Sequence, residues 1–295
     1  MNPAYAGAMK TTHVGVQYRD QWPAMNNAYT TYFATFDTWI PKLSSGIGFS
    51  AYNDVQGNGV YTRSNYKFIY SKEIKLDRNW IMNGSMTAGV QINSLNFNQL
   101  IFSDGLDPEL GKNIPSGEEV PDENNRIVPD FGTGILLFNT KYFFGIACDH
   151  LHQPNQSIYS NSKQVLYRKF TAHFEVSFPW YKEGHFRKFC TFTPNFIIQT
   201  QGGEQNLTYG MYANRKNFSL GIWSRQTTKK STDVILMIGY MGKQMKTAIS
   251  YDTNIRGVGL QSHGAIELSI SYFLKKTAGK SNFPFYQTPG EWDVR

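Results

Sequence analysis

Long apolar runs are missing from this chain: no stretch approaches the roughly 20 apolar residues that a membrane-spanning helix needs, which excludes helical spans. Cysteine is also scarce, and 2 cysteines are too few for a disulfide framework. Cys148 and Cys190 lie among apolar neighbours in alternating segments, so we interpret both as small hydrophobic side chains. No basic and apolar leader precedes Asn2-Pro3, so an exported protein would carry this sequence after its signal peptide had been removed.

Motifs for catalysis and metal binding are absent as well. The chain has neither Gly-x-Ser-x-Gly nor a phosphate-binding loop, and neither cysteine stands in a recognised catalytic context. His150 and His152 could offer two metal ligands on one strand face, but no third ligand is evident nearby, which favours hydrogen-bonded imidazoles. Four other histidines lie apart in the sequence and could converge inside a barrel: His13, His173, His185 and His263. The sequence therefore predicts no catalytic residue, no cofactor and no metal site.

What the chain does contain is alternation of apolar and polar residues, recurring from Val14 to Phe273. In residues 170–178 every second side chain is apolar, and the others carry hydroxyl, imidazole or carboxyl groups. Such a strand suits either a two-sheet sandwich facing water or a barrel wall with lipid outside and a wet lumen inside. A mean hydropathy of −0.43 does not separate the two, because a barrel exposes only alternate residues to lipid.

Strand number and turn length favour the barrel. Alternating segments are centred near residues 16, 33, 48, 66, 87, 135, 146, 174, 196, 210, 222, 237, 249 and 269. Four links of about three residues fall on one side, at residues 77–79, 139–141, 215–217 and 242–244. The longest insertions fall on the other side, at residues 103–130, 152–166 and 254–264. We predict an all-β, transmembrane, antiparallel up-and-down β-barrel of 14 strands with short periplasmic turns and long extracellular loops.

Two periplasmic links depart from this pattern, near residues 38–45 and 179–189. The second mixes aromatic and cationic residues, which suits an interfacial belt or an ordinary surface turn equally well. We divide the chain into an N-terminal segment in the periplasm or lumen (1–10), the barrel (11–274) and a C-terminal extension (275–295). Residues 234–241 and 135–138 are apolar on both faces, so something apolar should cover their inward sides: the N-terminal segment, the C-terminal extension or a bound partner.

Charged side chains on the inward faces are the candidate functional residues. The predicted lumen and partner network consists of Arg19, Asp37, Asp149, Glu175, Asp252 and Glu267. Such a network can hold a barrel rigid, line an ion path or anchor a plug. The insertion at 103–130 also carries eight carboxylates against two cations, which indicates either a solvated external loop or a site for calcium or a basic partner.

The net charge of +7 is spread over turns and strand ends, so we expect contact with outer-membrane lipid and no nucleic acid.

Several phrases, read in order over residues 2–273, resemble the PorP/SprF family of outer-membrane proteins. They are Asn2-Pro3-Ala4-Tyr5-Ala6-Gly7, Tyr18-Arg19-Asp20-Gln21-Trp22-Pro23, Gly46-Ile47-Gly48-Phe49, Pro129-Asp130-Phe131-Gly132-Thr133-Gly134, Gly145 with His150, Gln153 and Pro154, Ser250-Tyr251-Asp252, and residues 263–270. The motif positions taken from this resemblance are Asn2, Pro3, Tyr5, Gly7, Gln21, Trp22, Asp130, Gly132, Gly134, His150, Pro154, His263 and Gly264. The chain departs from the family by continuing for about twenty residues past Phe273.

The resemblance implies a non-enzymatic barrel of the type IX secretion and gliding machinery in the outer membrane of a Gram-negative bacterium of the Bacteroidota type. It implies support for the export or surface anchoring of secreted adhesins through their C-terminal sorting domain. It also implies contact with the periplasmic lipoprotein ring or with peptidoglycan-binding components.

The main alternative from the residues alone is an outer-membrane diffusion channel or small-ligand transporter, and a barrel hydrolase and a soluble sandwich are less well supported.

Overall fold

The computed structural model describes residues 2–25, 29–100, 124–159, 162–181, 188–228, 232–256 and 264–274. Most of these residues are in β-strands, joined by short turns and four single-turn 3₁₀ segments. The strands are β1 (His13–Gln21), β2 (Tyr29–Ile40), β3 (Ser45–Gln56), β4 (Tyr61–Lys75), β5 (Ile81–Leu95), β6 (Asn125–Phe138), β7 (Tyr142–Asp149), β8 (Lys169–Val176), β9 (Phe178–Tyr181), β10 (Lys188–Gln201), β11 (Glu204–Arg215), β12 (Phe218–Thr227), β13 (Thr232–Met241), β14 (Met245–Arg256) and β15 (Ala265–Phe273). All fourteen predicted strand centres lie in separate strands of this set.

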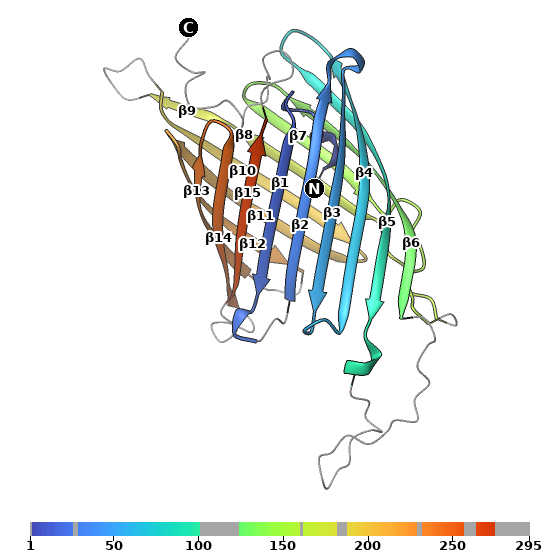
Figure 1. Ribbon diagram of the computed structural model, residues 1–295. Coiled ribbons are helices and arrows are strands. Elements are labelled where there is room, and N and C mark those ends of the chain that lie inside the picture. The colour runs from blue at the N-terminus through green and yellow to red at the C-terminus, as the bar shows by residue number, and fades with distance from the viewer. Residues whose placement is uncertain are drawn as a thin grey trace.

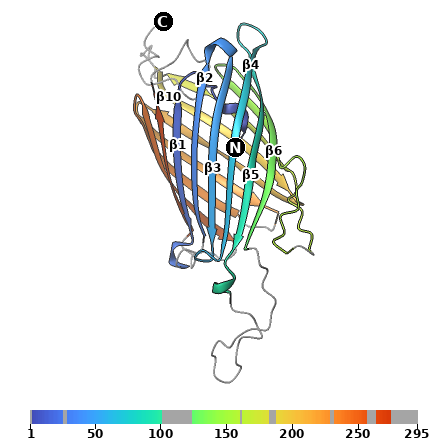
Figure 2. The same ribbon diagram turned by 45° about the vertical axis from the view of Figure 1, so that its right-hand side comes forward.

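The strands close into one antiparallel barrel (Figure 1). Consecutive strands pair with each other, except β8 with β9, and β1 pairs with β15 along its whole length, so that His13 faces Phe273 and Gln21 faces Ala265. β8 and β9 pair with successive parts of β10 and together occupy one wall position, interrupted at Ser177. The wall therefore has 14 positions, which confirms the predicted fold class. Figure 2 shows the long strands inclined across the wall.

Short turns close one end of the barrel, called the turn end below, and the longer links lie at the opposite loop end. Asp77 and Asn139 explain two of these turns, because each side-chain oxygen accepts the N–H groups two and three residues later. The Asp77 carboxylate lies 2.8 Å from the Trp80 nitrogen and 2.6 Å from the Asn79 nitrogen, and these N–H groups lower the pKa of its carboxyl group.

Three sequence-based link boundaries were wrong. The supposed link at 38–45 is half strand, because Thr38 and Trp39 pair with Ile47 and Gly46 and the connection itself is residues 41–44. At the second link, Phe178–Tyr181 form β9 and β10 begins at Lys188, while residues 182–187 lie outside the described residues. At the loop end, β6 begins at Asn125, inside the segment predicted as the 103–130 insertion.

The outer surface of the wall is apolar. Outward positions on adjacent strands carry large hydrophobic side chains, with Phe68 71% and Met86 72% exposed. On the closing strand Ile266, Leu268 and Ile270 alternate with inward polar residues and are exposed, as predicted for a lipid-facing surface. Trp180 and Tyr181 are exposed at the turn end, where an aromatic belt was predicted.

No helix in the described part of the chain is long and apolar enough to cross a membrane.

Candidate functional site in the barrel lumen

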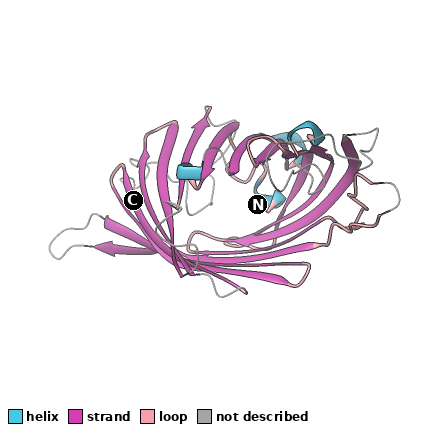
Figure 3. Cartoon of the chain, turned by 90° about the horizontal axis from the view of Figure 1, so that it is seen from below, coloured by secondary structure: helices cyan, strands magenta, loops and turns pink. Residues whose placement is uncertain are grey.

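The N-terminal segment, defined here as Asn2–Lys10, lies inside the barrel (Figure 3). Its position is set by contacts with the wall rather than by strand pairing, since Pro3–Tyr5 form one 3₁₀ turn that packs on β4, β5 and β6. Of the three covers proposed for the inward apolar faces, this segment is the one that the structure places over Leu136 and Phe138.

The side chain of Asn2 is bonded on both sides. Its Nδ2 donates to the carbonyls of Ile135 at 2.9 Å and Ile146 at 3.1 Å and lies 3.3 Å from His173 Nε2. Its Oδ1 accepts the Ala4 N–H at 2.9 Å, which caps the 3₁₀ turn. Asn2 is 3% exposed, so a side chain unable to make these bonds would leave buried polar groups unpaired.

The next residues of the segment pack against an apolar patch of the lumen. Ala4 and Ala8 join Leu136, Phe138 and Phe143 in a buried cluster with Ile81. The Tyr5 ring stacks on Phe143 at 5.2 Å and on His173 at 5.7 Å between centroids. The Ala4 carbonyl accepts bonds from Asn83 Nδ2 at 3.1 Å and Ser71 Oγ at 3.4 Å.

Charged groups hold the second half of the segment. Asp37 accepts the Gly7 N–H through Oδ2 at 2.9 Å, and its Oδ1 lies 2.9 Å from His13 Nδ1. Lys10 pairs with Glu73 at 2.9 Å and lies over the Trp39 ring at 5.0 Å. Asp37, predicted as part of a lumen network, therefore serves the N-terminal segment.

Glycines in the barrel wall provide the space that the N-terminal segment fills. A Cβ on Gly46 would lie 2.0 Å from the Ala6 carbonyl oxygen, and one on Gly134 would lie 2.3 Å from Asn2 Oδ1. Neither distance is compatible with a side chain, so the motif glycines of β3 and β6 have a steric reason that involves Asn2, Pro3 and Ala6.

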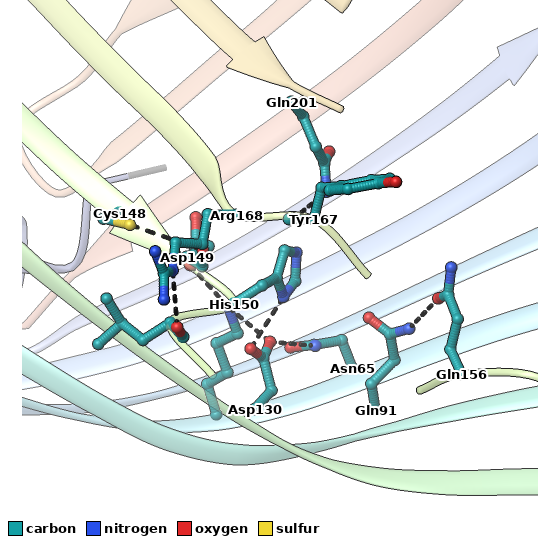
Figure 4. A network of polar contacts seen from close by, with 12 residues as sticks. Asn65, Gln91, Asp130, Cys148, Asp149, His150, Gln156, Tyr167, Arg168 and Gln201 are labelled. Carbon is teal, nitrogen blue, oxygen red and sulfur yellow. Dashed lines mark hydrogen bonds and ion pairs between the residues drawn. The ribbon is translucent and has the colours of Figure 1, made fainter. Parts of the chain in front are cut away.

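A second cluster surrounds Asp130 on the lumen wall, nearer the loop end (Figure 4). Its Oδ1 lies 2.8 Å from His150 Nδ1, and its Oδ2 accepts from Asn65 at 3.0 Å and pairs with Lys67 at 3.1 Å. Lys67 also pairs with Asp149 at 2.7 Å. Asp130 is 0% exposed, so it is not part of a solvated acidic loop, and its assignment to that loop was wrong: it pairs with Gly89 inside β6 and its side chain faces the lumen.

A third cluster lies at the loop end of β1, β12, β14 and β15. Arg19 pairs with Asp252 at 2.9 Å and with Glu267 at 3.3 Å, and Glu267 also accepts a bond from Gln17. Arg225 pairs with the same Asp252 at 2.8 Å. The structure thus brings together Arg19, Asp252 and Glu267 of the proposed lumen network and adds Arg225, which was not among the candidates.

The six predicted network residues are therefore distributed over several sites. Glu175 is in none of the three clusters and shares a hydrogen bond with Tyr212 on the lumen side. Asn65, Lys67 and Arg225 were missed, although each stands on the inward face of an alternating strand. Their place in the alternation of inward and outward residues could have identified them. Their partners come from other strands, so the local sequence spacing could not identify those.

The remaining motif residues lie near strand ends, except Gly132 in the middle of β6. The Trp22 N–H after Gln21 donates to the Gly264 carbonyl at 2.8 Å, closing β1 on β15 at the loop end. Pro154 accepts the Leu166 N–H at 3.0 Å within the 150–168 link. Gly132 faces Thr87 and Asp149. His263, His185 and the carboxylates between Asp104 and Glu123 lie outside the described residues, as does the predicted extension 275–295.

The His150-x-His152 pair does not share a strand face. β7 ends at Asp149, His150 has a φ of 59° in the following turn and bonds Asp130, and the His152 ring packs edge-on against Phe131. Among the residues that the structure describes, no group of three or more His, Cys, Asp or Glu side chains could hold a metal ion.

Comparison with known proteins gives a family match. The model of the family described as "Type IX secretion system membrane protein PorP/SprF" matches residues 1–272. A search of curated proteins gives no match.

Similar solved structures include Omp33 of Acinetobacter baumannii, at 6% identity over 90% of this chain and 98% of that chain, with a TM-score of 0.49. CdiB of the same species has 8% identity over 90% of this chain and 60% of that chain, with a TM-score of 0.49. A Pseudomonas aeruginosa FadL homologue has 12% identity over 92% of each chain and a TM-score of 0.45. Likenesses of this size carry no argument about function.

Proposed function

The chain belongs to the PorP/SprF family of type IX secretion system membrane proteins, and from this premise we propose that it holds exported adhesins in the outer membrane by binding their C-terminal sorting domain at the loop end. The protein acts without catalysis, as a receptor and anchor. Its turn end meets the periplasmic lipoprotein ring or peptidoglycan-binding components, and its apolar outer surface meets lipid.

The arrangement of the lumen is the observation that supports this proposal. The N-terminal segment contacts wall strands from β2 to β8 in the turn-end half, which weighs against a wide diffusion channel. The loop-end half keeps a charged cluster of Arg19, Arg225, Asp252 and Glu267, and the longest links connect strands at this end. A mouth that is polar and bordered by long loops suits a folded partner better than a small solute.

The test is retention of the adhesin when the longest link is shortened. Replacing residues 104–122 by a short Gly-Ser linker should leave a folded, heat-modifiable barrel in the outer membrane and release the adhesin into the medium. The matched control removes the same number of residues from the chain end, 277–295, which follows β15 at the turn end. Full-length protein purified in mild detergent should carry the adhesin at near-equal stoichiometry.

Retention equal to wild type after the 104–122 replacement would contradict the proposal. So would a bare full-length barrel that conducts ions freely in a planar bilayer, which would favour the channel.

A further inference from the structure

The wall residues that contact the N-terminal segment, called its seat below, have the features of a peptide-binding site. Several polar groups of the segment meet a wall group of matching kind: the Asn2 amide meets two strand carbonyls, the Ala4 carbonyl meets Asn83 and Ser71, and the Gly7 N–H meets Asp37. These wall groups bind backbone groups and one side-chain amide of the folded segment, as a peptide-binding site does.

Shape adds selectivity to this seat. Gly134 and Gly145 close on the Asn2 side chain, since a Cβ at either would lie under 3.0 Å from an Asn2 atom. Phe143 and His173 form an aromatic slot for the ring of Tyr5. Gly46 would collide with Ala6 and Gly7 if it carried a methyl group. The ligand that fits is a peptide with asparagine, proline, a small residue and an aromatic residue, followed by small residues.

The segment can leave without breaking the wall. β1 begins at His13, so Thr11 and Thr12 join the C-terminal end of the segment to the barrel. Lys10 has a φ of 56°, which places a sharp bend at this joint. The joint lies at the turn end, where Thr12 Oγ1 is 2.8 Å from Thr38 Oγ1 and β1 pairs with the end of β15. No ladder hydrogen bond of the barrel passes through residues 2–10.

We propose that the turn-end half of the lumen is a peptide-binding site and that Asn2–Lys10 is its resident ligand, one that leaves and returns to open and close this half of the barrel. A peptide of the same chemistry supplied in trans occupies the seat when the resident segment is weakened. This inference is independent of the proposed adhesin binding, which is assigned to the opposite end.

The experiment uses the full chain with Asn2→Ala and Tyr5→Ala, two changes that weaken the segment and leave every wall residue intact. Its conductance in a planar bilayer should be several-fold above that of the wild-type protein. The synthetic peptide Asn-Pro-Ala-Tyr-Ala-Gly-Ala-Met-Lys, added on the turn-end side, should return it toward the wild-type value. The same peptide with alanine at its Asn and Tyr positions should have no effect.

A seat-blocked control completes the design. Full-length protein carrying Gly46→Ala together with Asn2→Ala and Tyr5→Ala should stay conducting when the peptide is added, because the methyl group occupies the place of the Ala6 carbonyl. Heat-modifiable migration on gels checks that each barrel is folded.

Three results would overturn the proposal. The first is equal conductance of the wild type and the Asn2→Ala, Tyr5→Ala variant, because the segment then closes nothing. The second is a conducting variant that the matching peptide does not block. The third is failure of that variant, and of Tyr5→Ala alone, to give a folded barrel, because the segment would then be part of the wall rather than a ligand. Adhesin retention is measured separately, so failure here leaves the proposed function untouched.

Discussion

Lys67 lies between two carboxylates on the lumen wall, at 3.1 Å from Asp130 and 2.7 Å from Asp149. The Asp130 side chain is 0% exposed and that of Lys67 is 14% exposed, so these charges are stabilised mainly by each other and little by water. His150 and Asn65 supply the remaining contacts of Asp130. A single cation thus balances two acidic groups contributed by β6 and β7.

Replacing that cation should be costly. Lys67→Met leaves both carboxylates without their ion pair, and we expect the free energy of unfolding to fall by about 3–5 kcal/mol. Adding Asp130→Asn and Asp149→Asn should recover most of the loss, because no unpaired charge then remains. The measurement is denaturant unfolding of the purified barrel in detergent. Lys42→Met, at an exposed turn, is the control and should change stability by no more than about 0.5 kcal/mol. An equal effect of the two lysine changes would contradict this account.

At the scale of elements, the N-terminal segment and β3 fit together through Gly46. We expect Gly46→Ala to lower stability by about 1–3 kcal/mol, the usual cost of forcing extra volume into a packed site, because its Cβ would lie 2.0 Å from the Ala6 oxygen. Gly84→Ala on β5 is the matched control, since nothing lies within 4 Å of the Cβ position there.

The two variants are compared by denaturant unfolding and by the reactivity of a cysteine placed at Ala8, which is 1% exposed in the seated segment. Gly46→Ala should speed labelling of that cysteine, and Gly84→Ala should not. With the segment already weakened by Asn2→Ala and Tyr5→Ala, Gly46→Ala should cost little. An undiminished cost in that background would show that the methyl group clashes with the wall itself.

Elements and their inward faces were predictable from the sequence, and their partners were not. Alternation placed all fourteen wall positions and put Arg19, Asp37 and Asp252 on the lumen side, because parity is a local property of a strand. Which inward groups meet depends on the stagger between neighbouring strands and on the N-terminal segment, and neither leaves a local trace. The 38–45 link was predicted too long because β2 continues through Thr38-Trp39-Ile40 and ends only at Pro41.

The cover of the inward apolar faces is another feature that could not be predicted from the sequence. Leu136 and Phe138 are covered by Ala4 and Ala8, one of the covers that the sequence analysis had left open. On β13 the inward Ile235 and Met237 are not in contact with that cluster, and the extension 275–295 lies outside the described residues. A pattern of apolar residues on both faces predicts that something covers a strand, and only the tertiary arrangement says what.

For the whole molecule, the decisive property is that the outer face of the barrel wall and its lumen face meet different environments. Phe68 is the middle residue of β4 and is 71% exposed, whereas its neighbour Lys67 points into the lumen and is paired there. Adjacent residues of one strand therefore meet opposite environments, as expected when lipid surrounds the barrel and the lumen is polar.

A lysine on each face should reveal this difference. Phe68→Lys should lower the free energy of unfolding in lipid vesicles by about 2–4 kcal/mol, the cost of a cation near the bilayer midplane. Ser250→Lys on β14 is the control: Ser250 is paired in register with Glu267, so its side chain shares the lumen face with a carboxylate and the new charge should be tolerated. In a soluble protein, the exposed position of Phe68 would tolerate a lysine better than the inward position of Ser250. The variant that loses more unfolding free energy therefore tells a membrane barrel from a soluble protein. A larger loss from Ser250→Lys than from Phe68→Lys would mean that water, and not lipid, covers the outer surface.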